Sequence, residues 1–106
     1  MMIADESTFD TVLAQASTPV LVYFWATWCG PCRVLGPTLE RIEADSDGAF
    51  TILKVNADDS PELAARYRVM AVPSMKLVID GEVVRTIVGS KPRAALEAEL
   101  SPVLAV

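Results

Sequence analysis

The stretch VLVYFWATWCGPCRVLGP, residues 20–37, contains both cysteines and both tryptophans of the chain. Residues 20–25 are continuously apolar, β-branched or aromatic, which is typical of a strand buried on both faces. From Pro31 to about Ala44, apolar side chains recur at helical spacing, and the internal Pro37 is expected to kink that helix. The stretch therefore predicts a central parallel strand followed by a helix, with the two cysteines at the junction.

Further elements are predicted on both sides of this junction. They are a helix capped by Ser7, a strand over 50–56, a short helix with Ser60 as cap and Pro61 at its first position, strands over 75–79 and 82–88 joined by Asp80-Gly81, and a closing helix from Ser90 to about Leu100. No strand is assigned ahead of the first helix. Strands that alternate with helices before an antiparallel hairpin indicate an α/β protein with a mixed sheet and helices on both faces.

Composition excludes several classes of protein. With 106 residues, 52% hydrophobic and 22% charged, the chain is expected to form one domain over residues 1–106. The net charge of −5 without a basic block argues against nucleic acid or membrane partners. The sequence has no histidine, which removes Ser/His and Cys/His nucleophile pairs and histidine-ligated metals. The beginning, MMIADESTFD, lacks the basic and apolar regions of a secretory signal, so a cytoplasmic location is expected.

Three structural interpretations of the pair Cys29 and Cys32 stay open. A purely structural disulfide across two residues closes a very small loop and contributes only about 2 kcal/mol. A zinc site needs about four ligands, and the sequence has no third cysteine and no histidine, so only a zinc site shared between molecules would work and no metal site is predicted within the chain. Two buried thiols could also share this spacing by coincidence.

A redox interpretation explains more of the pattern. Cys29 is predicted at the start of a helix, where unpaired N–H groups and the helix dipole favour a thiolate, and Arg33 lies one turn away. Cys29 is thus expected to have a lowered pKa and to be the exposed nucleophile, with Cys32 inward in the first helical turn. Gly30 and Pro31 allow the sharp turn between them. A Cys-x-x-Cys pair near a βαβ pattern is typical of a redox motif.

The motif Trp-Cys-Gly-Pro-Cys at 28–32 and the stretch LKVNADDSPELAARYRVMAVPS at 53–74 resemble the thioredoxin family. Pro37, Gly81 and Gly89 also stand where the family pattern has them. The resemblance covers nearly the whole chain and implies the thioredoxin fold, with a mixed four- to five-stranded sheet and helices on both faces.

This resemblance also implies an activity, which is the reduction of protein disulfides. Cys29 would attack the substrate disulfide and Cys32 would resolve the mixed disulfide, which leaves a disulfide between the two. An NADPH-dependent thioredoxin reductase would restore the dithiol. The chain itself would bind no cofactor and is expected to be a monomer.

Residues around the pair have alternative interpretations. Trp28 either fills the core or forms a lid and substrate contact beside Cys29, whereas Trp25 is expected to pack behind the motif. The Val72-Pro73 bond would be trans by default, but the resemblance implies a cis proline beside the sulfurs. Backbone next to Pro73 would then pair with an extended substrate segment. The apolar surround of that segment is expected to be Met70, Ala71, Val72, Val88 and Gly89.

Lys54 and Tyr23 concern the space behind the cysteines. Lys54 is either an outward-facing lysine of a strand or, as the resemblance implies, a lysine close to a buried acid. That acid is missing, because the family commonly has Val-Asp-Phe-Trp where this chain has Val-Tyr-Phe-Trp at 22–25. Tyr23 can fill the space and donate a hydrogen bond, but the ordinary pKa of a tyrosine, near ~10, makes it a poor base.

Two other functions compete with disulfide reduction. An oxidant or isomerase would use the same cysteines, although Gly30-Pro31 between them resembles the reducing members of the family. A non-catalytic thioredoxin-like subunit that clamps another enzyme would not need the cysteines at all. A measured redox potential separates the first alternative from a reductase, and binding that survives replacement of both cysteines by serine would support the second.

Overall fold

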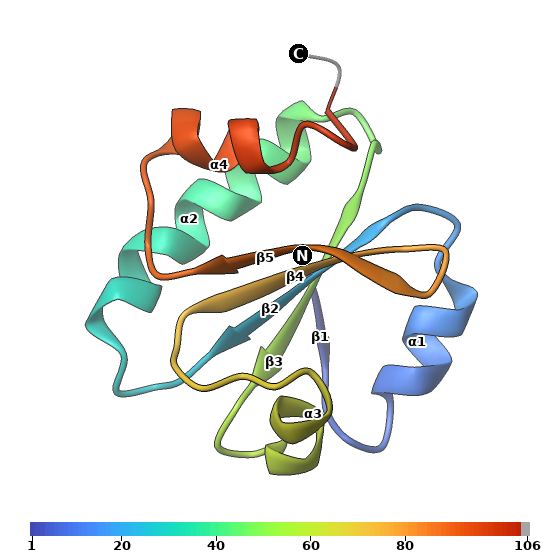
Figure 1. Ribbon diagram of the computed structural model, residues 1–106, viewed down its shortest axis with the longest axis vertical. Coiled ribbons are helices and arrows are strands. Elements are labelled where there is room, and N and C mark those ends of the chain that lie inside the picture. The colour runs from blue at the N-terminus through green and yellow to red at the C-terminus, as the bar shows by residue number, and fades with distance from the viewer. Residues whose placement is uncertain (105–106) are drawn as a thin grey trace.

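The computed structural model describes residues 1–104 as a five-stranded sheet between two layers of helices (Figure 1). The strands lie in the order β1-β3-β2-β4-β5, with β1 Met2–Ala4, β2 Val20–Trp25, β3 Thr51–Asn56, β4 Ser74–Ile79 and β5 Glu82–Val88. The helices are α1 Phe9–Gln15, α2 Gly30–Asp45, α3 Pro61–Arg66 and α4 Arg93–Glu99. None of the helices in this described part is long and apolar enough to cross a membrane. The predicted α/β class and mixed sheet are confirmed.

Strand β2 lies at the centre of the sheet and is buried on both faces. Leu21 and Tyr23 pack under α2 and α4, whereas Val22 and Phe24 pack against α1 and α3. β3 runs parallel to β2 on one side, and β4 runs antiparallel on the other. The prediction of a central, fully buried strand is confirmed. The strand was predicted to be parallel to its neighbours, and this holds for β3 but not for β4.

Two other predicted features are confirmed at the residue level. Helix α2 contains Pro37 and buries the predicted positions Leu35, Leu39 and Ile42. The β4–β5 hairpin turns at Asp80 and Gly81, which have φ values of 52° and 80°. Positive φ at both central residues defines the tight hairpin turn that Asp-Gly favours.

Strand β1 was not predicted. Its three residues pair in parallel with β3, with Met2 opposite Leu53 and Ala4 opposite Val55. Only Ala4 of the three is buried. A strand this short shows no alternation of apolar and polar residues, and its partner lies about 50 residues away, so local sequence carried no signal for it.

The predicted helix starts were partly wrong. Ser7 caps no helix: α1 begins one residue later than that cap would place it, and the Asp5 carboxylate accepts hydrogen bonds from the Ser7 hydroxyl at 2.6 Å and the Ser7 N–H at 2.9 Å. These bonds lower the pKa of Asp5. Ser60 does precede α3, but its buried hydroxyl has no hydrogen-bond partner among the described residues. α4 begins after Pro92 and not at Ser90.

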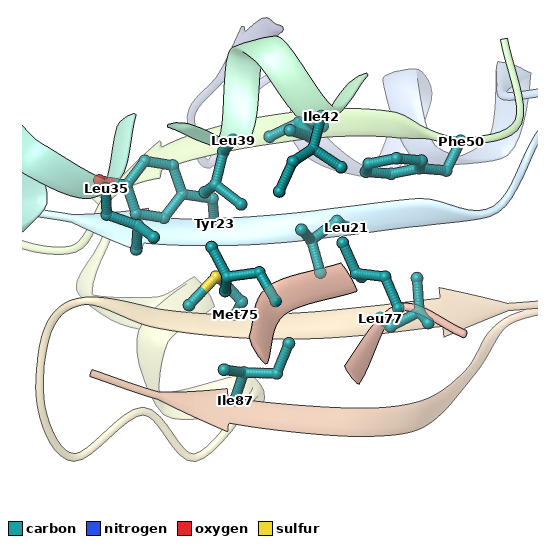
Figure 2. Close-up of a cluster of buried hydrophobic side chains, with 12 residues drawn as sticks. Leu21, Tyr23, Leu35, Leu39, Ile42, Phe50, Met75, Leu77 and Ile87 are labelled. Atoms are coloured by element: carbon teal, nitrogen blue, oxygen red, sulfur yellow. The ribbon is translucent and has the colours of Figure 1, made fainter. Parts of the chain in front are cut away.

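The main core lies between the sheet and the helices α2 and α4, and Figure 2 shows its side chains interleaved from both layers. Its labelled members are Leu21, Tyr23, Leu35, Leu39, Ile42, Phe50, Met75, Leu77 and Ile87. Because this cluster seats α2 on the sheet, it also sets the position of the first turn of α2, where the cysteines lie.

We expect Leu39→Ala to lower the free energy of unfolding by about 2–5 kcal/mol, because it opens a cavity in this cluster. Val34→Ala on the exposed side of the same helix is the matched control and should change stability by less than about 0.5 kcal/mol. Urea unfolding followed by circular dichroism measures both. Equal losses in the two variants would contradict the assignment of Leu39 to the core.

Candidate active site

The two cysteines lie where β2 passes into α2, and they form a disulfide. Cys29 is the N-cap residue of α2, and its Sγ accepts a hydrogen bond from the Cys32 N–H at 3.2 Å. Pro31 stands in the first turn after Gly30, where the missing N–H of proline costs no helical hydrogen bond. The Cys29 N–H donates to the Ala26 carbonyl at 3.2 Å. The predicted junction is therefore confirmed, and the Cys29 sulfur takes the place of a capping side-chain oxygen.

The surroundings of Cys29 favour negative charge. Unpaired N–H groups and the positive end of the helix dipole face the N-cap sulfur, and the first turn of α2 carries no acidic residue. The Arg33 guanidinium folds back and donates to the Thr27 carbonyl at 3.2 Å. This bond closes the loop between strand and helix and keeps a cation near the first turn of α2.

The expectation that Cys29 is the exposed member of the pair is wrong for the disulfide form. Cys29 exposes 2% of its surface and Cys32 exposes 4%. Ala26 lies in the same buried cluster, and Trp25 and Val72 pack against it. Burial therefore does not distinguish the two sulfurs, and only the Cys29 sulfur accepts a backbone N–H.

Trp28 lies on the surface directly before Cys29. It is 68% exposed, so the alternative in which it fills the core is wrong. Its indole N–H donates to the Asp58 carboxylate at 2.7 Å. Asp58 is held by a turn in which the Asn56 side chain accepts the N–H groups of Asp58 and Asp59. The indole is thus fixed by a charge-assisted hydrogen bond while its ring faces solvent.

An apolar surface adjoins Trp28 and contains several of the predicted substrate-binding residues. Trp28, Met70, Ala71 and Val72 line one shallow hollow of about 170 Å³. Met70 is 94% exposed and lies next to the exposed Trp28 in this hollow, so the two form a contiguous apolar patch of the kind that marks interaction sites.

Pro73 extends this region toward β5. The Val72-Pro73 peptide bond is cis, as the resemblance implied. The Pro73 carbonyl accepts the Gly89 N–H at 2.9 Å, and the next residue, Ser74, pairs with Val88. The structure therefore brings together predicted residues that are far apart in the sequence.

Tyr23 and Lys54 lie behind the disulfide. The Tyr23 hydroxyl donates to the Cys32 carbonyl at 3.1 Å, and burial raises the pKa of Tyr23 to about 12. Lys54 pairs with Tyr23 in the β2–β3 register, and its Nζ lies 4.3 Å from the centre of the Trp25 ring. Lys54 is half-buried against that ring, so the outward-facing alternative is wrong.

The family model described as thioredoxin matches residues 1–102 of this chain. The chain belongs to the thioredoxin family. A thioredoxin from Streptomyces clavuligerus is 48% identical over 91 residues, which cover 86% of this chain and 84% of that protein. A thioredoxin from Mycobacterium tuberculosis strain H37Rv is 42% identical over 99 residues, which cover 93% of this chain and 85% of that protein.

A third relative is a longer protein of Mycobacterium leprae, named bifunctional thioredoxin reductase/thioredoxin. It is 43% identical over 102 residues, which cover 96% of this chain and 22% of that protein. Thioredoxin family membership together with the Cys29–Cys32 pair makes this chain a thiol-disulfide oxidoreductase that reduces protein disulfides.

Sequence reasoning missed Asp58 as part of this thioredoxin site. The signal was present, because Asn and Asp close together after a strand are typical of a turn in which an Asx side chain accepts backbone N–H groups. The link to Trp28 could not be predicted, since the two residues are 30 positions apart and belong to different loops.

We expect Cys29 to titrate below the ordinary cysteine value of about 8.5 and Cys32 to titrate above Cys29. Burial is similar for both, and only Cys29 gains the N–H donor and the helix terminus. Thiolate absorbance against pH in the reduced variants Cys32→Ser and Cys29→Ser measures the two pKa values separately. A more acidic Cys32 would contradict this assignment.

We expect Asp58→Ala to lower kcat/KM for a disulfide-bonded protein about threefold, because the Trp28 indole loses the hydrogen bond that holds it. Asp59→Ala removes the same charge one residue away and is the matched control. Stopped-flow reduction measures both variants, and a thermal melt confirms that both are folded. An equal loss of kcat/KM in the two variants would contradict a role for the Trp28–Asp58 hydrogen bond, because it would show that the loss comes from the removed negative charge.

Proposed function

We propose that Cys29 is the attacking thiol and Cys32 the resolving thiol of this disulfide reductase. The Cys29 thiolate attacks one sulfur of the substrate disulfide, forms a mixed disulfide and releases the first substrate thiolate. The Cys32 thiolate then attacks the Cys29 sulfur and releases the second. The substrate gains two electrons, and the chain keeps the Cys29–Cys32 disulfide. The observation that carries these roles is the hydrogen bond from the Cys32 N–H to the Cys29 sulfur at the start of α2.

Gly30 and Pro31 support this exchange by holding the two sulfurs in one turn of chain. Both stand in the first turn of α2, and the cysteine Cα atoms are 5.3 Å apart. A short, pre-shaped turn lets the resolving thiol reach the mixed disulfide without a large loss of chain entropy.

We also propose that substrates bind across Trp28, Met70, Ala71, Val72, Pro73, Val88 and Gly89. The exposure of Trp28, Met70 and Val88 supports this assignment, as does Val72, which packs against the cysteine cluster and shares a hollow with Trp28 and Met70. An extended substrate segment would pair with the backbone next to Pro73, so main-chain hydrogen bonds would supply affinity with little sequence preference. Apolar contacts with Met70 and Trp28 would adapt to different side chains.

The proposed electron donor is an NADPH-dependent thioredoxin reductase. The name of the fused Mycobacterium leprae relative, which joins a reductase to a thioredoxin, supports that pairing. In this proposal the chain works in the cytoplasm as a monomeric single domain over residues 1–106, transfers electrons from the reductase to protein disulfides, and binds no cofactor of its own.

We expect the wild-type chain to catalyse reduction of insulin when dithiothreitol or the reductase supplies electrons, and Cys29→Ser to abolish it. Cys32→Ser should instead accumulate a mixed disulfide with the substrate, because attack proceeds and resolution does not. Turbidity measures turnover, and intact-protein mass spectrometry detects the adduct. Retention of about a tenth of the activity in Cys29→Ser, or adduct formation on Cys32, would contradict the proposed roles.

A further inference from the structure

The Tyr23 side chain ties the backbone of the inner cysteine to the central strand. Figure 2 shows the Tyr23 ring among the buried side chains between the sheet and α2. The ring belongs to the same buried cluster as Leu35, Leu39 and Met75 and is 1% exposed, so close packing restricts its movement. The hydroxyl donates to the Cys32 carbonyl at 3.1 Å.

Both sulfurs are therefore positioned from one strand. Cys29 follows β2 through a short loop, and its N–H donates to the Ala26 carbonyl. Cys32 is reached from the same strand by the Tyr23 hydroxyl. A carbonyl oxygen has two lone pairs, so the Cys32 carbonyl can accept this bond in addition to its helical one. Loss of the hydroxyl would remove the bond that holds the Cys32 carbonyl, while the Cys29 N–H bond and the Arg33–Thr27 bond would remain.

A hollow of about 280 Å³ opens behind Cys32, between α2 and β3. Cys32, Tyr23 and Lys54 line it, whereas the proposed substrate-binding residues Trp28 and Met70 do not. The hollow therefore adjoins the inner cysteine on a different side from the proposed substrate-binding surface. It has room for several water molecules, and Cys32 lines it although the residue is only 4% exposed, so water in the hollow lies next to the inner cysteine.

The titratable and charged groups that face this hollow come from two strands, from helix α2 and from the first residue of the chain. Lys54 comes from β3, Arg33 and Glu40 come from α2, and Tyr23 comes from β2. Met1 also lines it, and its amino group pairs with Glu43 at 2.7 Å. Lys54 is held over the Trp25 ring, so a cation stays on this side of the disulfide. Nearby cations favour the thiolate form of a cysteine.

We propose that Tyr23 is a positioning residue for Cys32, and that the Cys32 thiol releases its proton to water in the hollow behind it. This inference rests on the proposed roles of Cys29 and Cys32. During resolution the Cys32 thiol gives its proton to water, the resulting thiolate attacks the Cys29 sulfur, and the departing substrate thiolate takes a proton from solvent. Tyr23 keeps its own proton throughout the neutral range, because burial raises its pKa to about 12.

The first test removes the Tyr23 hydroxyl and leaves the ring. Tyr23→Phe should slow release of the second substrate thiol about threefold at every pH, which corresponds to the loss of one ordinary hydrogen bond, and should leave attack by Cys29 unchanged. Tyr67→Phe is the matched control, because Tyr67 packs against Phe9 and Phe24 on the other face of the sheet. Single-turnover stopped-flow kinetics separates attack from release, and a thermal melt verifies folding.

The second test follows release against pH. If water accepts the proton, the midpoint of the release profile should match the pKa of the Cys32 thiol measured in Cys29→Ser. Lys54→Met should raise both values together by roughly 0.5–1 pH unit. Arg85→Met removes the same charge from β5 and should leave both unchanged.

The outcomes separate this inference from the proposed function. Failure of the wild-type chain to reduce any protein disulfide would overturn the proposed function. A wild-type chain that is active, with Tyr23→Phe indistinguishable from Tyr67→Phe, would overturn the positioning role alone. A release midpoint that lies about a pH unit or more below the Cys32 pKa would reveal an internal base and overturn release to water.

Discussion

Strand β2 has to lie inside the sheet, because Val20 to Phe24 offer no polar face to water. Helices α2 and α4 cover one face of the strand and α1 and α3 cover the other, as Figure 1 shows. The strand therefore cannot shift without exposing one of two cores. Because the chain runs from β2 through a short loop into α2, burial of this one strand also determines where the disulfide lies.

The start of α2 then makes the two cysteines chemically different. Both are buried to nearly the same degree, so the cost of removing a thiolate from water does not distinguish them. Cys29 takes the N-cap position, where its sulfur accepts the Cys32 N–H. Cys32 lies inside the first turn, and its carbonyl is engaged by Tyr23. The start of α2, with its unpaired N–H groups, thus gives Cys29 a hydrogen-bond donor that the Cys32 sulfur lacks.

The disulfide has two sides with different properties. On one side, Trp28 and Met70 present an apolar surface that is exposed although burial would be favourable, which suits a site that another protein covers. On the other side, Tyr23 and Lys54 border a hollow open to solvent. The apolar surface and the hollow therefore lie on different sides of the disulfide and share none of their lining residues.

Much of the fold followed from local patterns. The continuous apolar run of β2, the helical spacing of α2 and the Asp80-Gly81 turn each carry their structure within a few residues. Strand β1 could not be predicted in this way, because three residues are too few to show an alternation of apolar and polar side chains. The strand forms through its pairing with β3. The Ser7 cap was placed wrongly for a related reason, since Ser, Thr and Asp compete for the same N–H groups and only the final geometry selects one, whereas Ser60 and Pro61 do stand at the start of α3 as predicted.

For the site, the sequence by itself determined the chemistry: two thiols at a strand-to-helix junction, with no histidine to assist them and a tyrosine where the family has an acid. Tertiary structure decided which groups meet that chemistry. It buried Cys29, joined Trp28 to Asp58 and directed the Tyr23 hydroxyl at the Cys32 carbonyl. The position of the two cysteines at the start of a helix depends on residues next to them in the sequence, so a local pattern can predict it. Burial and hydrogen bonds between distant segments depend on how the sheet and helices pack, which no local pattern contains.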